Sequence, residues 1–252
     1  MEYKRYLNFK YAFTFSSINY LQSAVSFIST LLLARSISQT EFGYLSYGLV
    51  FANSINTMMQ FGTERTLVRD LVQQKEPDIF LWSAAWIWFV FGSIISLAIT
   101  AWSFFFSDMG LHVAIIVTLC TITGFTRGMS PIPWFDYKGK ANYQSLILLA
   151  DRSLFLIGCI ILLLFFRNEQ VVLCACIIQL LIRFFTLAWE WKYVTKTAQI
   201  KIRPVFAVIK KVITSNTLVW VASLSSILIF QVNQLILDDK CGPAEMAVYG
   251  IA

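Results

Sequence analysis

The segment YQSLILLADRSLFLIGCIILLLFF, residues 143–166, is an apolar run interrupted by the adjacent charged residues Asp151 and Arg152. A helix rises about 1.5 Å per residue, so this segment is long enough to cross a hydrocarbon core of about 30 Å. Its composition predicts a membrane-spanning helix, and its two charges mark a position inside the membrane that needs a physical explanation.

The composition of the whole chain agrees with this reading. Of its 252 residues, 58% are hydrophobic and only 13% are charged, against about 25% charged in an average soluble domain. So few charges cannot build a water-facing surface, which excludes a soluble enzyme, a disordered tail and a nucleic-acid-binding domain. The net charge of +6 is typical of a membrane protein with basic cytoplasmic loops.

Seven segments are apolar and long enough to span the membrane, and an eighth begins near residue 246. The predicted spans are 11–34, 44–61, 79–106, 112–134, 143–166, 170–190 and 215–237. Lys and Arg alternate between the loops so that 14 of the 20 fall on one side, three on the other and three inside spans. The positive-inside rule therefore predicts an all-α, polytopic membrane helix bundle with a cytoplasmic amino terminus. Aromatic residues between Trp82 and Tyr193 are predicted to cluster at the cytoplasmic interface.

A short internal similarity predicts two lobes. A shift of 204 residues matches Leu31, Leu33 and Glu41 with Leu235, Leu237 and Glu245. We interpret residues 1–190 as a six-helix first lobe, 191–214 as a basic cytoplasmic linker with an interfacial segment, and 215–252 as the start of a second lobe. On this interpretation the chain looks truncated and is expected to be inactive alone in transport. Chance similarity between two apolar helices is the alternative.

Four ionisable side chains are predicted inside the spans: Arg127, Asp151, Arg152 and Arg183. An unpaired charge at mid-bilayer costs at least about 2.5–3.5 kcal/mol, so such groups face the bundle interior or a wet cavity. Arg152 lies about 15 Å into its span, and Arg127 and Arg183 lie about 10 Å inside the cytoplasmic boundary. Asp151 cannot pair with Arg152, because neighbouring side chains on a helix diverge, but it can reach Arg127 or Arg183 on another helix.

Two interpretations of these residues stay open. In the first, the arginines line a cationic cavity for an anionic head group, because the planar guanidinium suits a pyrophosphate. In the second, each arginine is tied to Asp151, Glu190, a backbone carbonyl or a lipid phosphate. Amides such as Asn53 and Gln179 are interpreted mainly as hydrogen-bonding groups between helices. The pair Gly124 and Gly128 favours a close helix contact.

The sequence contains no pattern typical of catalysis or of metal binding. His112 is the single histidine and has no serine or carboxylate partner at a catalytic spacing. Four of the five cysteines fall in apolar runs, where cysteine behaves as a small hydrophobe. We therefore expect a protein that is not an enzyme and that uses neither a cofactor nor a metal.

Three motifs resemble a known family. The segment SPIPWFDYKGK (130–140) resembles the P-x-W-[FY]-x-x-G signature after the fourth span of polysaccharide flippases, through Pro133, Trp134, Phe135 and Gly139. The segments QTEFGY (39–44) and QFGTERTLVR (60–69) resemble that family's entry to and exit from its second span. The chain thus resembles Wzx-type O-antigen flippases of the multidrug/oligosaccharidyl-lipid/polysaccharide exporter superfamily.

This resemblance implies a multi-pass protein of the bacterial inner membrane. It also implies transport of undecaprenyl-diphosphate-linked oligosaccharide by alternating access between two lobes, with other membrane proteins of polysaccharide assembly as candidate partners and no nucleic acid. One alternative is a multidrug exporter of the same superfamily, for which deep carboxylates such as Asp151 are expected as ion sites. A second alternative is a membrane polysaccharide polymerase or ligase, for which a large periplasmic loop is expected, whereas the predicted outer loops are short.

Overall fold

The computed structural model describes residues 9–73, 76–105, 110–165, 169–197 and 205–251, and within these ranges every regular element is a helix. This confirms the predicted all-α class. The elements are α1 (Phe9–Ser36), α2 (Gln39–Met59), α3 (Thr63–Gln73), α4 (Pro77–Phe105), α5 (Leu111–Gly128), α6 (Ile132–Tyr137), α7 (Ala141–Phe165), α8 (Glu169–Thr197), α9 (Phe206–Cys241) and α10 (Pro243–Ile251).

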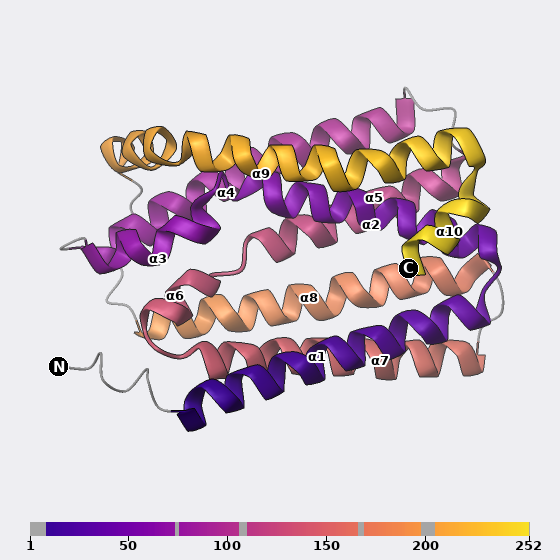
Figure 1. Ribbon diagram of the computed structural model, residues 1–252, viewed down its shortest axis with the longest axis horizontal. Helices are drawn as coiled ribbons and strands as arrows, with labels where there is room; N and C mark the ends of the chain where they lie inside the picture. Colours follow the sequence, from indigo (N-terminus) through magenta and orange to yellow (C-terminus); the bar gives the residue numbers. More distant parts are fainter. Residues whose placement is uncertain (1–8, 74–75, 106–109, 166–168, 198–204, 252) are drawn as a thin grey trace.

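The long helices lie side by side along the length of the molecule (Figure 1). The short helices α3 and α6 lie at the end where α1 begins, α8 ends and α9 begins. The opposite end holds the last turns of α1, α4, α7 and α9 and the first turns of α2, α5, α8 and α10. The chain therefore alternates between two ends, and we refer to the end with α3 and α6, where the basic loops were predicted, as the cytoplasmic end.

In the described part of the chain, six helical segments are long and apolar enough to cross a membrane, so the protein is a multi-pass membrane protein by length and hydropathy. These candidate spans are Tyr11–Ser36, Pro77–Phe105, Leu111–Tyr137, Ala141–Phe165, Gln170–Thr197 and Phe206–Ile227. They correspond to six of the seven predicted spans. The other, predicted over 44–61, is present as helix α2 but is not among the six.

Helix α2 differs from its neighbours because it is the innermost helix and carries polar residues. Eleven of its 21 residues are buried, and it packs against α5, α4, α9 and α10. Asn53 and Asn56 lower its hydropathy, which a helix surrounded mainly by protein tolerates better than one surrounded by lipid.

Two small residues allow α2 and α5 to approach closely. A Cβ atom at Gly124 would lie 2.3 Å from the carbonyl oxygen of Ala52, and one at Gly128 would lie 2.2 Å from the sulfur of Met59. Such distances leave no room for any side chain, which confirms the close contact predicted from the Gly124–Gly128 spacing.

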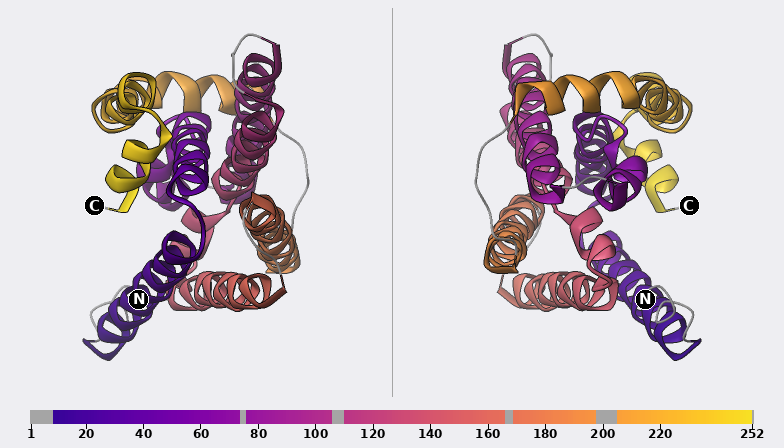
Figure 2. Two further views of the ribbon diagram at one scale, coloured as in Figure 1. Left: turned by 90° about the vertical axis from the view of Figure 1, so that its right-hand side faces the viewer. Right: turned by 90° about the vertical axis from the view of Figure 1, so that its left-hand side faces the viewer.

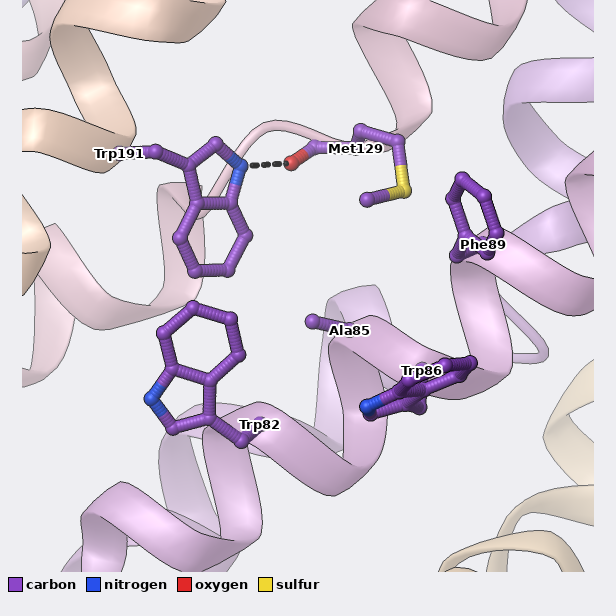
Figure 3. A pocket seen from close by; sticks show the side chains of 6 residues that line it. All are labelled: Trp82, Ala85, Trp86, Phe89, Met129 and Trp191. Atoms are coloured by element: carbon purple, nitrogen blue, oxygen red, sulfur yellow. Dashed lines mark hydrogen bonds between the residues drawn. The ribbon is translucent and has the colours of Figure 1, made fainter. Parts of the chain in front are cut away.

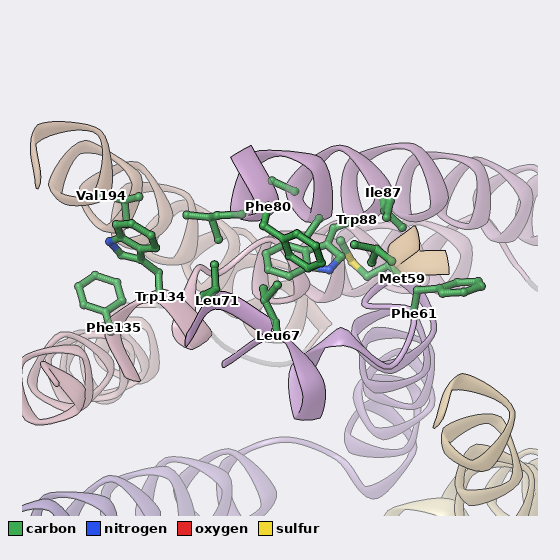
Figure 4. Packing of buried hydrophobic residues seen from close by; sticks show 14 of the residues in the cluster. Met59, Phe61, Leu67, Leu71, Phe80, Ile87, Trp88, Trp134, Phe135 and Val194 are labelled. Carbon is green, nitrogen blue, oxygen red and sulfur yellow. The ribbon is translucent and has the colours of Figure 1, made fainter. Parts of the chain in front are cut away.

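The largest buried cluster lies at the cytoplasmic end (Figure 4). Leu67 and Leu71 on α3 pack beneath Phe80 and Trp88 of α4, and Trp134 of α6 belongs to the same cluster. The two short helices therefore close this end of the bundle with an apolar face. The predicted aromatic cluster is also confirmed here: the rings of Trp82 and Trp191 are 5.0 Å apart, and those of Tyr143 and Tyr193 are 4.9 Å apart.

The internal similarity has a structural counterpart. Helices α2 and α10 begin at Gln39 and Pro243, which are offset by the same 204 residues, and each follows a long helix after a tight connection. The two helix starts are also in contact: Gln39 Nε2 donates to the carbonyl oxygen of Ala244 at 2.9 Å, and a Cβ at Gly43 would lie 1.9 Å from the carbonyl oxygen of Pro243.

Both ends of the predicted linker 191–214 are helical, because α8 continues to Thr197 and α9 begins at Phe206. A regular helix satisfies its own backbone hydrogen bonds, so both helices extend beyond the apolar core of each span. Most of the expected interfacial segment falls within 198–204 and lies outside the described residues. The division into two lobes stays a prediction.

Candidate functional site

A polar cavity of about 240 Å³ lies between α1, α2, α5, α7 and α8. In the view along the bundle, α1, α7 and α8 surround the part of the molecule below α2 and α5 (Figure 2). The polar residues of its lining are Ser26, Thr30, Ser46, Asn53, Arg127, Arg152 and Gln179. No carboxylate side chain is among the described residues that line it. Thr30 and Asn53 are exposed, so the cavity opens to one side between α1 and α2.

Arg152 reaches this cavity from the middle of α7. The helix runs from residue 141 to residue 165, so Arg152 lies one residue before its centre. The cavity wall extends from this depth to Leu33 and Phe42 near the outer ends of α1 and α2. Arg152 therefore lies near the middle of its candidate membrane span and lines a polar hollow.

Arg127 enters the same cavity from the last turn of α5. Among the residues that the structure describes, no carboxylate oxygen lies within 4.0 Å of the guanidinium of Arg127 or of Arg152. Two positive charges thus share one cavity, and neither has a direct ion pair with a carboxylate in the described part of the chain. In such a low-dielectric place, charges of this kind need water or a bound anion as a partner.

Arg183 does not line this cavity, although sequence reasoning grouped it with the other two. It is 2% exposed, and its Nη2 atom lies 3.6 Å from Oε2 of Glu190, which is fully buried. Ser130 donates a hydrogen bond of 2.7 Å to the same carboxylate oxygen. Arg183 and Glu190 are seven residues apart, or two turns, on one face of α8. The geometry of Arg183 therefore matches the second interpretation, in which the arginine is tied to Glu190.

Asp151 pairs with neither Arg127 nor Arg183 within 4.0 Å in the described part of the chain. Its Oδ1 atom instead accepts a hydrogen bond of 3.1 Å from the hydroxyl of Thr186 on α8. Asp151 is buried and does not line the cavity. The acidic and basic members of the adjacent pair 151–152 therefore face different surroundings, as expected for successive positions on a helix.

The residues of the P-x-W-[FY]-x-x-G segment lie in the buried core of the cytoplasmic end and in the turn that follows it. Trp134 and Phe135 are 1% exposed and belong to the cytoplasmic cluster. Gly139 has φ of 66°, a left-handed conformation that favours glycine, and its carbonyl oxygen accepts a hydrogen bond from Tyr11 of α1 at 3.2 Å. The motif with Pro133 thus forms the turn that connects α5 to α7.

A second hollow of about 460 Å³ lies at the cytoplasmic end and is lined by Trp82, Ala85, Trp86, Phe89, Met129 and Trp191. Figure 3 shows Trp82 and Trp191 on one side of this aromatic groove and Trp86 and Phe89 on the other. The indole nitrogen of Trp191 donates to the carbonyl oxygen of Met129 at 2.9 Å. The groove suits apolar chains of lipids and offers little to a polar group.

Sequence reasoning missed part of the cavity. Ser26 and Thr30 on α1 were not singled out, and Asn53 and Gln179 were interpreted mainly as contacts between helices. A usable signal was present, since polar residues recurred at spacings that place them on one face of α1 and near the midpoints of α2 and α8.

Comparisons with known proteins add no assignment: no protein-family model, curated protein or solved structure matches the chain.

Proposed function

We propose that this protein is a membrane transporter whose Arg127–Arg152 cavity receives the diphosphate group of undecaprenyl-diphosphate-linked oligosaccharide. The transport step moves this lipid across the bacterial inner membrane by alternating access, for the synthesis of O-antigen or another surface polysaccharide. The proposal joins the motif resemblance to Wzx-type flippases with the chemistry of the cavity.

The observation that carries the proposal is the pair of guanidinium groups in one polar cavity with no carboxylate in its described lining. Arginine presents a planar fork of N–H donors that binds phosphate oxygens in pairs. Two such forks match a diphosphate better than they match a neutral or cationic substrate. The opening between α1 and α2 lets a lipid place its head group inside while its chain stays in the membrane.

A multidrug exporter of the same superfamily is less well supported. Such a protein needs acidic groups in its substrate or ion pathway, and Asp151 is bonded to Thr186 outside the cavity. A polysaccharide polymerase or ligase lacks an equivalent supporting observation in the described residues.

Binding to the chain in nanodiscs tests the proposal directly. We expect undecaprenyl diphosphate to bind more tightly than undecaprenyl phosphate or undecaprenol, because its second phosphate adds negative charge and acceptor oxygens for the two arginines. Replacing either arginine, in Arg152→Gln or Arg127→Gln, removes a charged hydrogen-bonding group and should weaken binding about tenfold to a hundredfold.

Arg69→Gln is the matched control, since Arg69 is exposed and pairs with Asp70 on α3, away from the cavity. Native mass spectrometry reports both the folded chain and the bound lipid. Equal binding of the diphosphate and monophosphate lipids, or wild-type binding by both cavity variants, would contradict the proposal.

A further inference from the structure

A third hollow, of about 200 Å³, lies where α2 ends, α3 begins and α9 passes beside them. Its described lining is Thr57, Gln60, Gly62, Glu64, Ser223 and Ser226. It shares no residue with the Arg127–Arg152 cavity and lies at the cytoplasmic end of α2. We call it the α2–α9 pocket.

The turn between α2 and α3, which forms one wall of this pocket, is held by contacts from α4 and α9. Phe61 and Gly62 adopt left-handed conformations, with φ of 51° and 70°, and Phe61 adopts this region at a cost of about 1–2 kcal/mol. The indole of Trp88 on α4 donates to Thr63 Oγ1 at 2.7 Å, and that of Trp220 on α9 donates to the carbonyl oxygen of Met58 at 2.9 Å. The turn is therefore fixed in place before any ligand binds.

Three hydroxyl groups of the lining already donate their protons within their own helices. Thr57 donates to the carbonyl oxygen of Asn53 at 3.1 Å, Ser223 to that of Val219 at 3.0 Å, and Ser226 to that of Ala222 at 3.4 Å. A hydroxyl has one proton and two lone pairs. Toward a ligand, each of these hydroxyl groups can therefore act only as a hydrogen-bond acceptor.

Gln60 and Glu64 add two stronger acceptors. Gln60 is 7% exposed, and its Oε1 atom is buried without a hydrogen-bond partner in the described part of the chain. A buried polar atom without a partner is costly, and such atoms mark places where water or a ligand binds. Glu64, in the first turn of α3, contributes the carboxylate.

We propose that the α2–α9 pocket binds a primary ammonium group. A primary ammonium carries one positive charge and three N–H donors, which complement one carboxylate and several neutral acceptors. The single carboxylate argues against a divalent ion, which prefers several, and the described residues contain no cluster of three His, Cys, Asp or Glu that could hold a metal. This inference is independent of the anion site.

The ammonium has two sources with the same chemistry: a soluble amine, or the head group of phosphatidylethanolamine in the cytoplasmic leaflet. The test uses the whole chain in nanodiscs of phosphatidylcholine, with ethylammonium as the probe and saturation-transfer NMR as the readout. Tetramethylammonium, with the same charge and no N–H donor, is the ligand control.

We expect saturable binding of ethylammonium that tetramethylammonium does not displace at equal concentration. Glu64→Gln should weaken this binding about tenfold, and Gln60→Leu by a similar factor. Glu245→Gln should leave it unchanged, because Glu245 is exposed in the first turn of α10, at the opposite end of the bundle. Glu64 is also exposed, so the Glu64→Gln chain keeps the test valid if Gln60→Leu fails to fold.

Adding phosphatidylethanolamine to the discs assigns the source. Competition with ethylammonium supports the pocket and identifies the lipid head group, whereas undiminished binding supports the pocket and identifies a soluble amine. The proposal is overturned if ethylammonium does not bind saturably, if tetramethylammonium competes equally, or if the Glu64→Gln chain binds as tightly as the wild type.

Discussion

Arg183 on α8 and Arg152 on α7 are both guanidinium groups inside membrane-spanning helices, but their surroundings differ. Arg183 is buried against Glu190, whose carboxylate also accepts a hydrogen bond from Ser130. Arg152 shares a polar cavity with Arg127 and has no carboxylate within 4.0 Å in the described residues. Depth in the membrane therefore does not decide the role of a charge. The partners of the two arginines among the described residues differ, and on the function proposed above it is the arginine without a nearby carboxylate that binds an anion.

The largest change in the free energy of unfolding is expected when the Arg183–Glu190 ion pair on α8 is broken. Glu190→Ala leaves the Arg183 guanidinium buried without its counter-charge, which should lower the free energy of unfolding by about 3–5 kcal/mol. Urea unfolding in mixed micelles, followed by circular dichroism, measures this change. Glu245→Ala, at an exposed position, is the control and should change stability by less than about 0.5 kcal/mol. A small effect of Glu190→Ala would mean that the pair is not structural.

A smaller loss of stability is expected when Asp151 loses the hydrogen bond that it accepts from the neutral side chain of Thr186. Thr186→Val removes the hydroxyl that donates to the buried carboxylate, and hydrogen bonds to charged groups contribute about 1.5–3 kcal/mol. Thr217→Val, at an exposed hydroxyl bonded only within its own helix, serves as the matched control in the same unfolding measurement. Equal effects of the two changes would show that the Asp151 contact contributes nothing specific.

Removing Arg152 should act in the opposite direction on stability. Arg152→Met replaces a charge that has no carboxylate within 4.0 Å in the described residues with an apolar side chain of similar length, so the free energy of unfolding should rise by about 1 kcal/mol or more. Loss of diphosphate binding together with unchanged or greater stability is the pattern of a binding residue. A destabilised Arg152→Met chain would place Arg152 with Arg183 among the structural groups.

The smallest net change is expected when both members of the α8 pair are replaced. In Arg183→Met/Glu190→Leu the two desolvated charges disappear together, and the free energy of unfolding should return to within about 1 kcal/mol of the wild type. Diphosphate binding should also be unaffected, because neither residue lines the cavity. Loss of binding in the double variant would show that the two regions are coupled.

The sequence predicted the long helices well because hydrophobic length is a strong local signal. It did not predict α3, since a window sized for a membrane span overlooks an 11-residue helix, although Leu67 and Leu71, both members of the buried cluster, recur one turn apart. The sequence analysis also placed Arg183 in one group with Arg152, because both lie well inside apolar predicted spans.

Only the rotation of each helix about its axis separates these arginines, and rotation depends on packing between helices that are distant in the sequence. The spacing of Arg183 and Glu190 by two turns was one local signal of their pairing. No comparable signal joined Arg127 to Arg152 in one cavity, because they lie on different helices and share no motif.

The contact between Gly43 and Pro243 has a mechanical consequence. The atoms of Pro243 nearest to Gly43 all belong to its backbone. Around this contact the side chains of the two helices do interlock, because Met246 packs with Tyr47 and Val50, and Ala247 belongs to the same cluster as Phe42. Interlocked side chains permit only discrete changes of packing. The starts of α2 and α10 are therefore expected to move together as one packed unit, and a methyl group added at position 43 would collide with the backbone of Pro243 rather than with a movable side chain.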